Sequence, residues 1–197
     1  MSALLLLSGG LDSALVAALF RPGTAAFVDY GQRPAAGERR AARTIASSLG
    51  LPLEEVSVDL TPLGSGLLTG QRQLDVAPSP EWFPFRNQFL VTVAAAIAVR
   101  QRADEVWIGL TAGDGIRHRD GSAEFVSALN DLLVMQEGAV RLRAPAGHLA
   151  CEDLVTDARL PRDLLDHTIS CHISPVACGQ CPGCNKRSNA LRSSERA

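Results

Sequence analysis

No apolar run in this 197-residue sequence reaches the ~20 residues that a membrane-spanning helix needs. The apolar start 4–7 lacks a preceding basic residue, and Ser8-Gly9-Gly10 follows it at once, so it does not have the form of a secretory signal. The sequence also lacks a strong charge of either sign, because 19 basic and 21 acidic residues give a net charge of -2. Such a balance creates no field that recruits nucleic acid or anionic membranes. These absences predict a soluble, cytoplasmic protein without a membrane partner, and they make direct nucleic-acid binding an unfavoured function.

Cysteine is absent from the first 150 residues. A secreted disulfide framework would distribute an even number of cysteines along the chain. Here four of the five crowd into one C-terminal segment, which suits metal ligation in a reducing compartment: Cys171, Cys178, Cys181 and Cys184.

The spacing Cys-x6-Cys-x2-Cys-x2-Cys brings four soft ligands close together, and Gly179 and Gly183 permit the tight turns that aim them at one ion. A closed, tetrahedral four-thiolate site is typical of structural zinc, so we predict Zn²⁺ here. An iron–sulfur cluster is the first alternative, and metal-free disulfides are the second. Cys151 stands apart from this group and is predicted to be a small buried residue rather than a nucleophile.

Short apolar segments alternate with helical ones along the chain. Strands are predicted at 3–7, 25–28, 53–58, 105–109 and 140–142, and helices at 11–20, 35–49, 87–100 and around 125–133. This alternation predicts an α/β fold in which a parallel sheet is covered by helices on both faces. The segment 61–84 contains several glycine and proline residues and is predicted to be an irregular excursion that serves a site or is mobile.

Ser8-Gly9-Gly10-Leu11-Asp12-Ser13 lies between the first predicted strand and the first helix. The unpaired amides and the positive dipole end of a helix N-terminus hold anions, and two glycines let the backbone approach an oxyanion. The serines offer hydroxyl groups, and Asp12 can orient the loop or hold Mg²⁺, which would bridge phosphates. The segment therefore predicts a phosphate-binding loop.

The segment 8–13 does not fit two other kinds of nucleotide-binding loop. A Walker loop needs Gly-Lys-Ser/Thr, and no lysine is near, since the chain's only lysine is Lys186. The spacing of the glycines does not match the G-x-G-x-x-G of a dinucleotide-binding loop. A turn followed by an ordinary helix cap remains the plain structural alternative.

The segment 8–13 resembles the PP-loop of the ATP pyrophosphatases, which cleave ATP to AMP and pyrophosphate, usually by adenylating an oxygen of the substrate. Further motifs narrow the resemblance. They are Val28-Asp29-Tyr30-Gly31-Gln32-Arg33 at the end of the second strand, Pro84-Phe85-Arg86-Asn87 at the start of the helix predicted at 87–100, Ile108 to Asp114 at the end of the fourth strand, Asp120, Glu124-Phe125, and the C-terminal cysteines. Together they resemble the 7-cyano-7-deazaguanine synthase family of the queuosine pathway over nearly the whole chain.

This resemblance implies a Rossmann-like fold of the adenine nucleotide alpha hydrolase (HUP) type, a homodimer, and an ATP-dependent carbon–nitrogen ligase. The implied reaction converts 7-carboxy-7-deazaguanine and ammonia to the nitrile with release of AMP and pyrophosphate. The implied cofactors are ATP, Mg²⁺ and the Zn²⁺ of the cysteine group. We expect residues 1–165 to form the nucleotide-binding part and residues 166–197 to form a zinc-binding segment of the same domain.

The resemblance also implies roles for individual residues. Those expected at the nucleotide are Ser8, Gly9, Gly10, Leu11, Asp12, Ser13, Tyr30, Gln32 and Arg33. The catalytic set is expected to be Asp12, Ser13, Arg86 and Asp114. The residues expected at the substrate are Asn87, Asp114, Asp120 and Glu124.

Three positions depart from the family pattern. A family lysine in a Leu-x-Lys-x-Glu segment has no counterpart in 148–152, where Ala150 and Cys151 stand. A family loop rich in aromatic residues reads Gly115 to Arg119 here, and a family arginine becomes Ser122. Lys186 does not replace the lysine by sequence position alone, and Arg117 or Arg119 is the expected source of the missing charge. The acceptor is thus open, with a protein terminus or a nucleic acid as alternatives, and an inactive nucleotide-binding module as a third.

Overall fold

A computed structural model describes residues 2–158 and 160–194. Five strands form one sheet in the order β3-β2-β1-β4-β5, and every neighbouring pair is parallel. The strands are β1 (Ala3–Leu6), β2 (Thr24–Asp29), β3 (Leu53–Ser57), β4 (Glu105–Trp107) and β5 (Arg141–Arg143). This sheet confirms the predicted Rossmann-like α/β fold.

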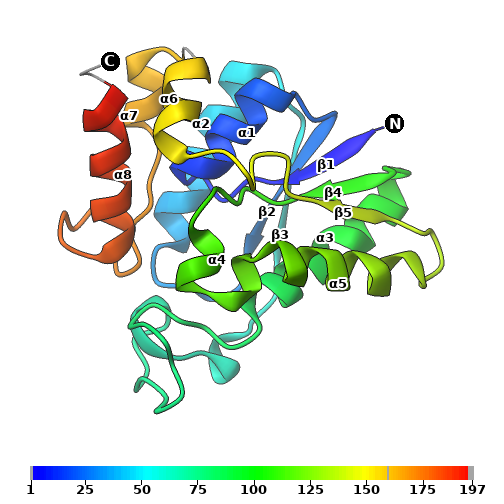
Figure 1. Ribbon diagram of the computed structural model, residues 1–197, viewed down its shortest axis with the longest axis horizontal. Coiled ribbons are helices and arrows are strands. Elements are labelled where there is room, and N and C mark those ends of the chain that lie inside the picture. Colours follow the sequence, from blue (N-terminus) through cyan, green and yellow to red (C-terminus); the bar gives the residue numbers. More distant parts are fainter. Residues whose placement is uncertain (1, 159, 195–197) are drawn as a thin grey trace.

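Helices cover both faces of the sheet, as predicted (Figure 1). Side chains alternate between the two faces of a strand, so both faces of β1 need an apolar cover. Leu5 packs into a first core cluster on one face of the sheet, and Leu4 and Leu6 pack into a second cluster on the other face. The first cluster includes side chains of α1 (Leu11–Phe20), α2 (Ala35–Leu49), α6 (Cys151–Ala158), α7 (Arg162–Asp166) and α8 (Pro182–Ser194). The second cluster is built with α3 (Arg86–Gln101) and α5 (Ala123–Val134), and a short α4 (Asp114–Arg117) follows β4.

The helices α1 and α2 begin and end at the predicted residues. Gly50 ends α2 in the left-handed conformation, and its amide donates to the last turn of the helix, as a glycine just past a helix commonly does. The helices after residue 150 were not predicted. The helix α8 begins within the cysteine motif, between Cys181 and Cys184. Its first residue is Pro182, whose missing N–H removes no helical hydrogen bond in the first turn.

The excursion 61–84 contains two short 3-10 turns, Thr61–Leu63 and Gly66–Leu68, and is otherwise irregular, as predicted. It projects beyond the edge of the sheet at the bottom of Figure 1. Its Phe83 packs edge-on against Tyr30 with ring centroids 5.5 Å apart, and Leu68 joins them in a small separate core. This core fixes the base of the excursion beside the end of β2.

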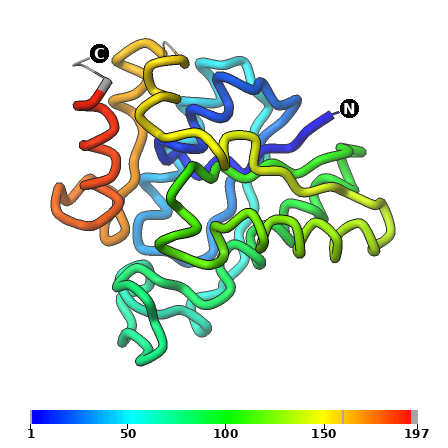
Figure 2. Tube along the Cα trace, in the orientation of Figure 1, coloured from blue at the N-terminus to red at the C-terminus, as the bar shows by residue number. Residues whose placement is uncertain are grey.

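The C-terminal segment returns to the beginning of the chain, as Figure 2 shows for the orange and red part of the tube. The Ile169 amide donates to the carbonyl of Gly9 at 2.9 Å, and Arg40 Nη2 donates to the Pro175 carbonyl at 3.0 Å. Residues on both sides of the predicted division at 165/166, such as Leu165 and Ile169, pack into the same core cluster. The division itself stays a prediction.

Within residues 2–158 and 160–194, no helix combines the length and the apolar character that crossing a membrane requires.

Gly37 marks the closest approach between α2 and the C-terminal segment, because a Cβ there would collide with the carbonyl of Pro175. We predict that Gly37→Ala lowers the free energy of unfolding by about 1–3 kcal/mol, since backbone atoms have to move apart. The matched control is Gly23→Ala, whose Cβ would lie no closer than 3.7 Å to any neighbour. Chemical denaturation measures both variants, and equal stabilities would contradict the close packing.

Candidate active site

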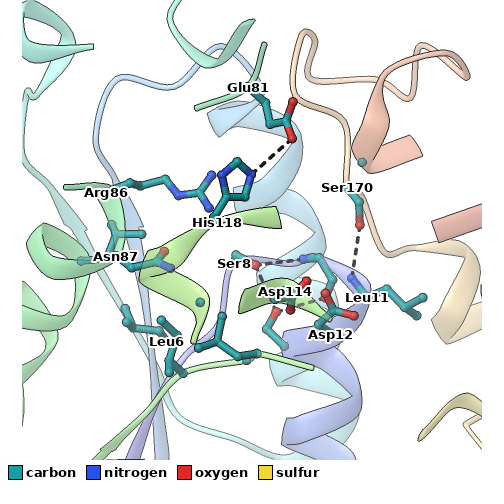
Figure 3. A pocket seen from close by; sticks show the side chains of 18 of the residues that line it. Leu6, Ser8, Leu11, Asp12, Glu81, Arg86, Asn87, Asp114, His118 and Ser170 are labelled. Atoms are coloured by element: carbon teal, nitrogen blue, oxygen red, sulfur yellow. Dashed lines mark hydrogen bonds and ion pairs between the residues drawn. The ribbon is translucent and has the colours of Figure 1, made fainter. Parts of the chain in front are cut away.

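A cavity of about 760 Å³ opens at the carboxyl ends of β1, β2 and β4. The strand order runs outward in opposite directions from β1 and β4, so this is the switch point at which open parallel sheets bind ligands. Figure 3 shows side chains from the first loop, the start of α3, α4 and the C-terminal segment facing one space. Of the predicted site residues, the structure brings eleven to the lining: Ser8, Gly10, Leu11, Asp12, Ser13, Tyr30, Gln32, Arg86, Asn87, Asp114 and Asp120.

The predicted phosphate loop forms the floor of this cavity. Gly10 caps α1 in an extended conformation, and Ser13 Oγ donates to the Gly10 carbonyl at 3.0 Å. Ser8 Oγ lies 3.2 Å from Ser13 Oγ and accepts from the Gly10 amide at 3.3 Å. The loop is thus held by its own serines, with hydroxyl groups and the first turn of α1 turned toward the cavity.

Gly9, on the side of the loop that contacts α2, does not line the cavity. Its φ is +76°, and a Cβ there would lie 2.8 Å from the Ala41 Cβ, so the close contact with α2 requires glycine. Ser170 of the C-terminal segment was not predicted as a site residue. Its Oγ accepts a hydrogen bond from the Leu11 amide at 3.5 Å and thereby supports the start of α1. An isolated serine in a cysteine-rich tail carries no pattern that could have identified it.

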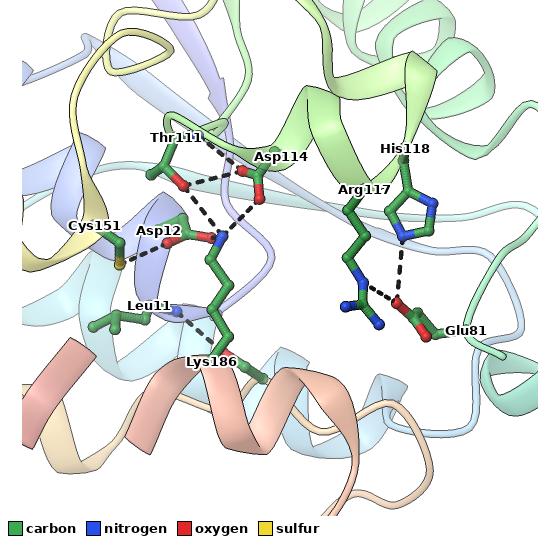
Figure 4. A network of polar contacts seen from close by, with 10 residues as sticks. Leu11, Asp12, Glu81, Thr111, Asp114, Arg117, His118, Cys151 and Lys186 are labelled. Carbon is green, nitrogen blue, oxygen red and sulfur yellow. Dashed lines mark hydrogen bonds and ion pairs between the residues drawn. The ribbon is translucent and has the colours of Figure 1, made fainter. Parts of the chain in front are cut away.

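Lys186 lines the cavity and lies among its carboxylates, a place that its position in the sequence alone did not indicate (Figure 4). Its Nζ donates to Asp12 Oδ2 at 2.8 Å, to Asp114 Oδ1 at 2.7 Å and to Thr111 Oγ1 at 3.1 Å. Burial lowers the pKa of this amine, but the two carboxylates outweigh it and raise the pKa above the ordinary value. The ammonium group therefore stays charged.

Both carboxylates at this lysine are held by further donors. The amide and Oγ1 of Thr111 donate to Asp114 Oδ2 at 2.8 and 3.1 Å. Cys151 Sγ donates to Asp12 Oδ1 at 3.0 Å. Burial and the nearby Asp12 raise the pKa of the Cys151 thiol, so it stays protonated. Its predicted burial is confirmed, and its hydrogen bond to the loop is an addition that the sequence did not indicate.

Gln32 is buried in the wall next to β2. Its Oε1 accepts from the Tyr30 amide at 2.8 Å, and its Nε2 donates to Glu38 Oε2 at 2.7 Å. Burial raises the pKa of Glu38 to about 7, although the Gln32 hydrogen bond acts against the increase. Glu38 lines the cavity from α2. Gln32 therefore fixes the wall through contacts within the protein.

Arg86 and Asn87 begin α3 and enter the cavity wall together. Asn87 Nδ2 donates to the Asp120 carbonyl at 2.8 Å, and the Asn87 amide donates to Asp120 Oδ2 at 3.4 Å. Burial raises the pKa of Tyr30, while the neighbouring Arg86 opposes that increase. The start of α3 is thus tied to the loop after α4, and Arg86 is left facing the cavity (Figure 3).

On the side next to the excursion, the cavity is bordered by a polar cluster that the sequence did not indicate. Glu81 is 2% exposed, and its Oε1 accepts from Arg117 Nε at 2.5 Å and lies 3.3 Å from His118 Nε2. Burial alone would raise the pKa of Glu81, but hydrogen bonds from His118 and Arg117 hold it well below its usual range. Among the described residues, Glu81 Oε2 and His118 Nδ1 have no hydrogen-bond partner. Arg117 thus reaches the cavity already paired, and Arg119 is not part of the lining.

Two more predicted site residues lie outside the cavity. The exposed Arg33 runs alongside Gly70 of the excursion. Glu124 is exposed in the first turn of α5, where Ser122 Oγ accepts from the Phe125 amide at 3.1 Å as a helix cap. Ser122, where the family arginine was expected, is therefore a capping residue here.

The four clustered cysteines converge, and all their Sγ atoms lie within 4.8 Å of one another. In a regular tetrahedron of ~2.3 Å zinc–sulfur bonds, the sulfurs are about 3.8 Å apart. Cys178 and Cys184 have their Sγ atoms 3.9 Å apart. Backbone amides also point at the sulfurs, from His172 to Cys181 at 3.3 Å and from Cys181 to Cys178 at 3.4 Å. The four thiols thus have the spacing and surroundings of a tetrahedral metal site.

Comparison with known proteins gives a match over nearly the whole chain. The profile of the family described as "Queuosine biosynthesis protein QueC" matches residues 2–195. A 7-cyano-7-deazaguanine synthase of Methanopyrus kandleri is 33% identical, with 94% of this chain and 92% of the relative covered. The synthase of Methanospirillum hungatei is 32% identical, with 98% and 95% covered. That of Nitratiruptor sp. is 29% identical, with 95% and 92% covered.

The raised pKa of Glu38 makes stability depend on pH. A carboxyl group with a folded-state pKa of about 7 and an ordinary value of 4.5 binds its proton more tightly in the folded state. The free energy of unfolding should therefore fall as the pH rises from 4.5 to 7, by at most about 3 kcal/mol. Glu38→Gln should lose this dependence, while the exposed Glu152→Gln should keep it. Denaturant unfolding between pH 4.5 and 8 measures it, and parallel curves for all three proteins would contradict the burial of Glu38.

Proposed function

This chain belongs to the queuosine biosynthesis protein QueC family, and we propose that it converts 7-carboxy-7-deazaguanine and ammonia to 7-cyano-7-deazaguanine with ATP. The proposal rests mainly on the cavity at the switch point, which is lined by the phosphate loop, Arg86 and Asp114. Relatives that cover nearly the whole chain carry the name of this synthase, which supports the same substrate class.

The chemistry runs in two activation steps. A carboxylate oxygen of the substrate attacks the α-phosphorus of ATP, which forms an acyl adenylate and releases pyrophosphate. Ammonia then attacks the acyl carbon, AMP leaves, and after loss of a proton the primary amide remains. A second ATP adenylates the amide oxygen, and departure of AMP with loss of two protons leaves the nitrile. One phosphate site can serve both steps, because each of them turns an oxygen into a leaving group.

The residues of the cavity would act by positioning and by offsetting charge. The hydroxyls of Ser8 and Ser13 and the amides at the start of α1 would bind phosphate oxygens. Arg86 would bind the phosphates or the substrate carboxylate, since a guanidinium matches either geometry. Asn87 and Asp120, which are tied together at the start of α3, would border the deazapurine.

The alternatives of a protein or nucleic-acid acceptor, and of an inactive module, are not favoured. The departures Gly115 and Ser122 pack against each other, since a Cβ on Gly115 would lie 2.8 Å from Ser122 Cα. The chain lacks the family lysine at 148–152, but it has the ammonium group of Lys186 beside Asp12. Positive charge next to the phosphate loop supports ATP as the ligand.

For the cofactors we propose Mg²⁺ with ATP, and Zn²⁺ at the four cysteines. Magnesium would offset the charge of the phosphates, with Asp12 and Asp114 as its closest carboxylates. The zinc site would be closed and structural, because four thiolates complete its coordination. We also propose a cytoplasmic homodimer. The exposed side chains of Phe85 (68%) and Ile116 (94%) offer apolar surface for such an association.

The purified protein should contain one zinc per chain, and Cys181→Ser should lose it, because three thiolates bind far more weakly than four. Elemental analysis measures the metal directly. A brown sample that contains iron instead of zinc would contradict the assignment and favour an iron–sulfur cluster.

The activity test supplies ATP, Mg²⁺, ammonia and 7-carboxy-7-deazaguanine, and measures pyrophosphate release together with formation of the nitrile. Asp12→Asn keeps the shape of the side chain but removes its charge, and should reduce turnover by about 100-fold or more. Asp131→Asn on the exposed face of α5 is the matched control and should stay within twofold, about 0.4 kcal/mol. Unchanged turnover in Asp12→Asn would remove Asp12 from the site. Pyrophosphate release with another acceptor alone would reject the proposed substrate.

A further inference from the structure

The cavity needs positive charge near its phosphate loop, because ATP carries about four negative charges at neutral pH and low dielectric surroundings strengthen their repulsion. In the described part of the chain, the permanently charged basic side chains of the lining are Arg86, Arg117 and Lys186. Arg117 is already paired with the buried Glu81. Lys186 contacts the loop itself, through Asp12.

We propose that Lys186 binds the phosphates of ATP and that the metal of the four cysteines positions it for this role. The inference rests on the proposed function insofar as it assumes ATP in this cavity. It assigns a second task to the metal, which would hold a catalytic side chain in addition to folding the tail.

The position of the ammonium group supports the first half of the proposal. Its three contacts to Asp12, Asp114 and Thr111 use all three donors of a lysine. The side chain is nevertheless 43% exposed, so one face of it remains open to the cavity. When a triphosphate lies on the loop, one donor can turn to a phosphate oxygen while a carboxylate still holds the group. The contact that forms is a charge-assisted hydrogen bond, the strong kind.

The place of Lys186 in the chain supports the second half. It lies on α8 only two residues after Cys184, and residues two apart on a helix point to nearly opposite sides. Cys184 therefore faces the other three cysteines. Lys186 reaches across to Asp12 and Asp114, as Figure 4 shows. A ligand bond at Cys184 fixes the turn from which the lysine extends.

Apart from the contacts of Lys186 itself, this turn has few other anchors without a metal. In the first half of α8 and just before it, the buried residues are the two ligands Cys181 and Cys184 and the small Gly183. Asn185 and Lys186 are exposed, and apolar burial resumes at Ala190. Arg187 adds hydrogen bonds to Thr168 Oγ1 and to the Leu165 carbonyl, both at 2.8 Å. Metal loss should therefore loosen the start of α8 while leaving the sheet and the phosphate loop in place.

The experiment compares Lys186→Met, Lys186→Arg and the matched control Arg192→Met, which removes one positive charge from an exposed position of the same helix. Calorimetry measures binding of the non-hydrolysable analogue α,β-methylene-ATP with Mg²⁺. Lys186→Met should keep one metal per chain and its helical spectrum, yet bind about tenfold more weakly or worse, a loss of about 1.4 kcal/mol. Its pyrophosphate release should fall about 100-fold or more, because a positioned charge acts on the transition state. Lys186→Arg should regain most of the binding, and Arg192→Met should match the wild type.

The role of the metal is tested by removing it with a chelator, followed by dialysis into Mg²⁺. The wild type should then lose about the same tenfold in affinity, whereas Lys186→Met should lose little more, since two changes in one pathway are not additive. Equal weakening of both proteins would overturn the positioning role. Binding by Lys186→Met at the strength of Arg192→Met would overturn the phosphate role.

These outcomes are separate from a failure of the proposed function. If the wild type makes no nitrile from 7-carboxy-7-deazaguanine, the substrate assignment fails, but the binding comparisons still decide on Lys186. If Lys186→Met does not fold, Lys186→Gln, which keeps hydrogen-bond donors but has no charge, provides the test. Binding of the analogue about tenfold weaker than by the wild type supports the phosphate role, and binding at the wild-type strength contradicts it.

Discussion

Two carboxylates that share one ammonium group tie the site together. Asp12 belongs to the loop after β1, Asp114 follows β4, and Lys186 reaches both from the C-terminal helix. This contact joins the two central strands of the sheet to a segment more than 70 residues further along the chain. The phosphate loop, the end of β4 and the metal-binding tail therefore take their places around one charge. A cavity for a highly charged ligand needs such a balance, because carboxylates without a cation would repel phosphates.

The sequence predicted the parts of the site that depend on local pattern. Gly9 and Gly10 predict a phosphate loop because they stand between a strand and a helix, and the structure has this segment at the switch point of the sheet. The ends of α2 follow from the asymmetry of Pro34 and Gly50. Closely spaced cysteines likewise predict a cluster within reach of one ion, and the structure brings their sulfurs together. All these features are set by interactions between residues close in sequence.

The rest depends on contacts between distant residues, which a single sequence does not reveal. Lys186 looked like part of a metal-binding tail because nothing in its neighbourhood points to Asp12. Glu81 stands in an irregular excursion without a motif, yet it contacts Arg117 of α4 and His118 just after that helix. Glu38 has the pattern of a solvated helix face, and it becomes a lining residue because segments far apart in the sequence complete the cavity. For Lys186 and Glu81, the packing of the tail or of the excursion against the sheet sets the position of the side chain.

The central claim is that the loop from Ser8 to Ser13 binds the triphosphate of ATP. A crystal structure with α,β-methylene-ATP and Mg²⁺ tests it most directly. The account predicts phosphate oxygens within hydrogen-bond distance of the Ser8 and Ser13 hydroxyls and of the first amides of α1. A nucleotide bound elsewhere, with this loop free of phosphate, would contradict it.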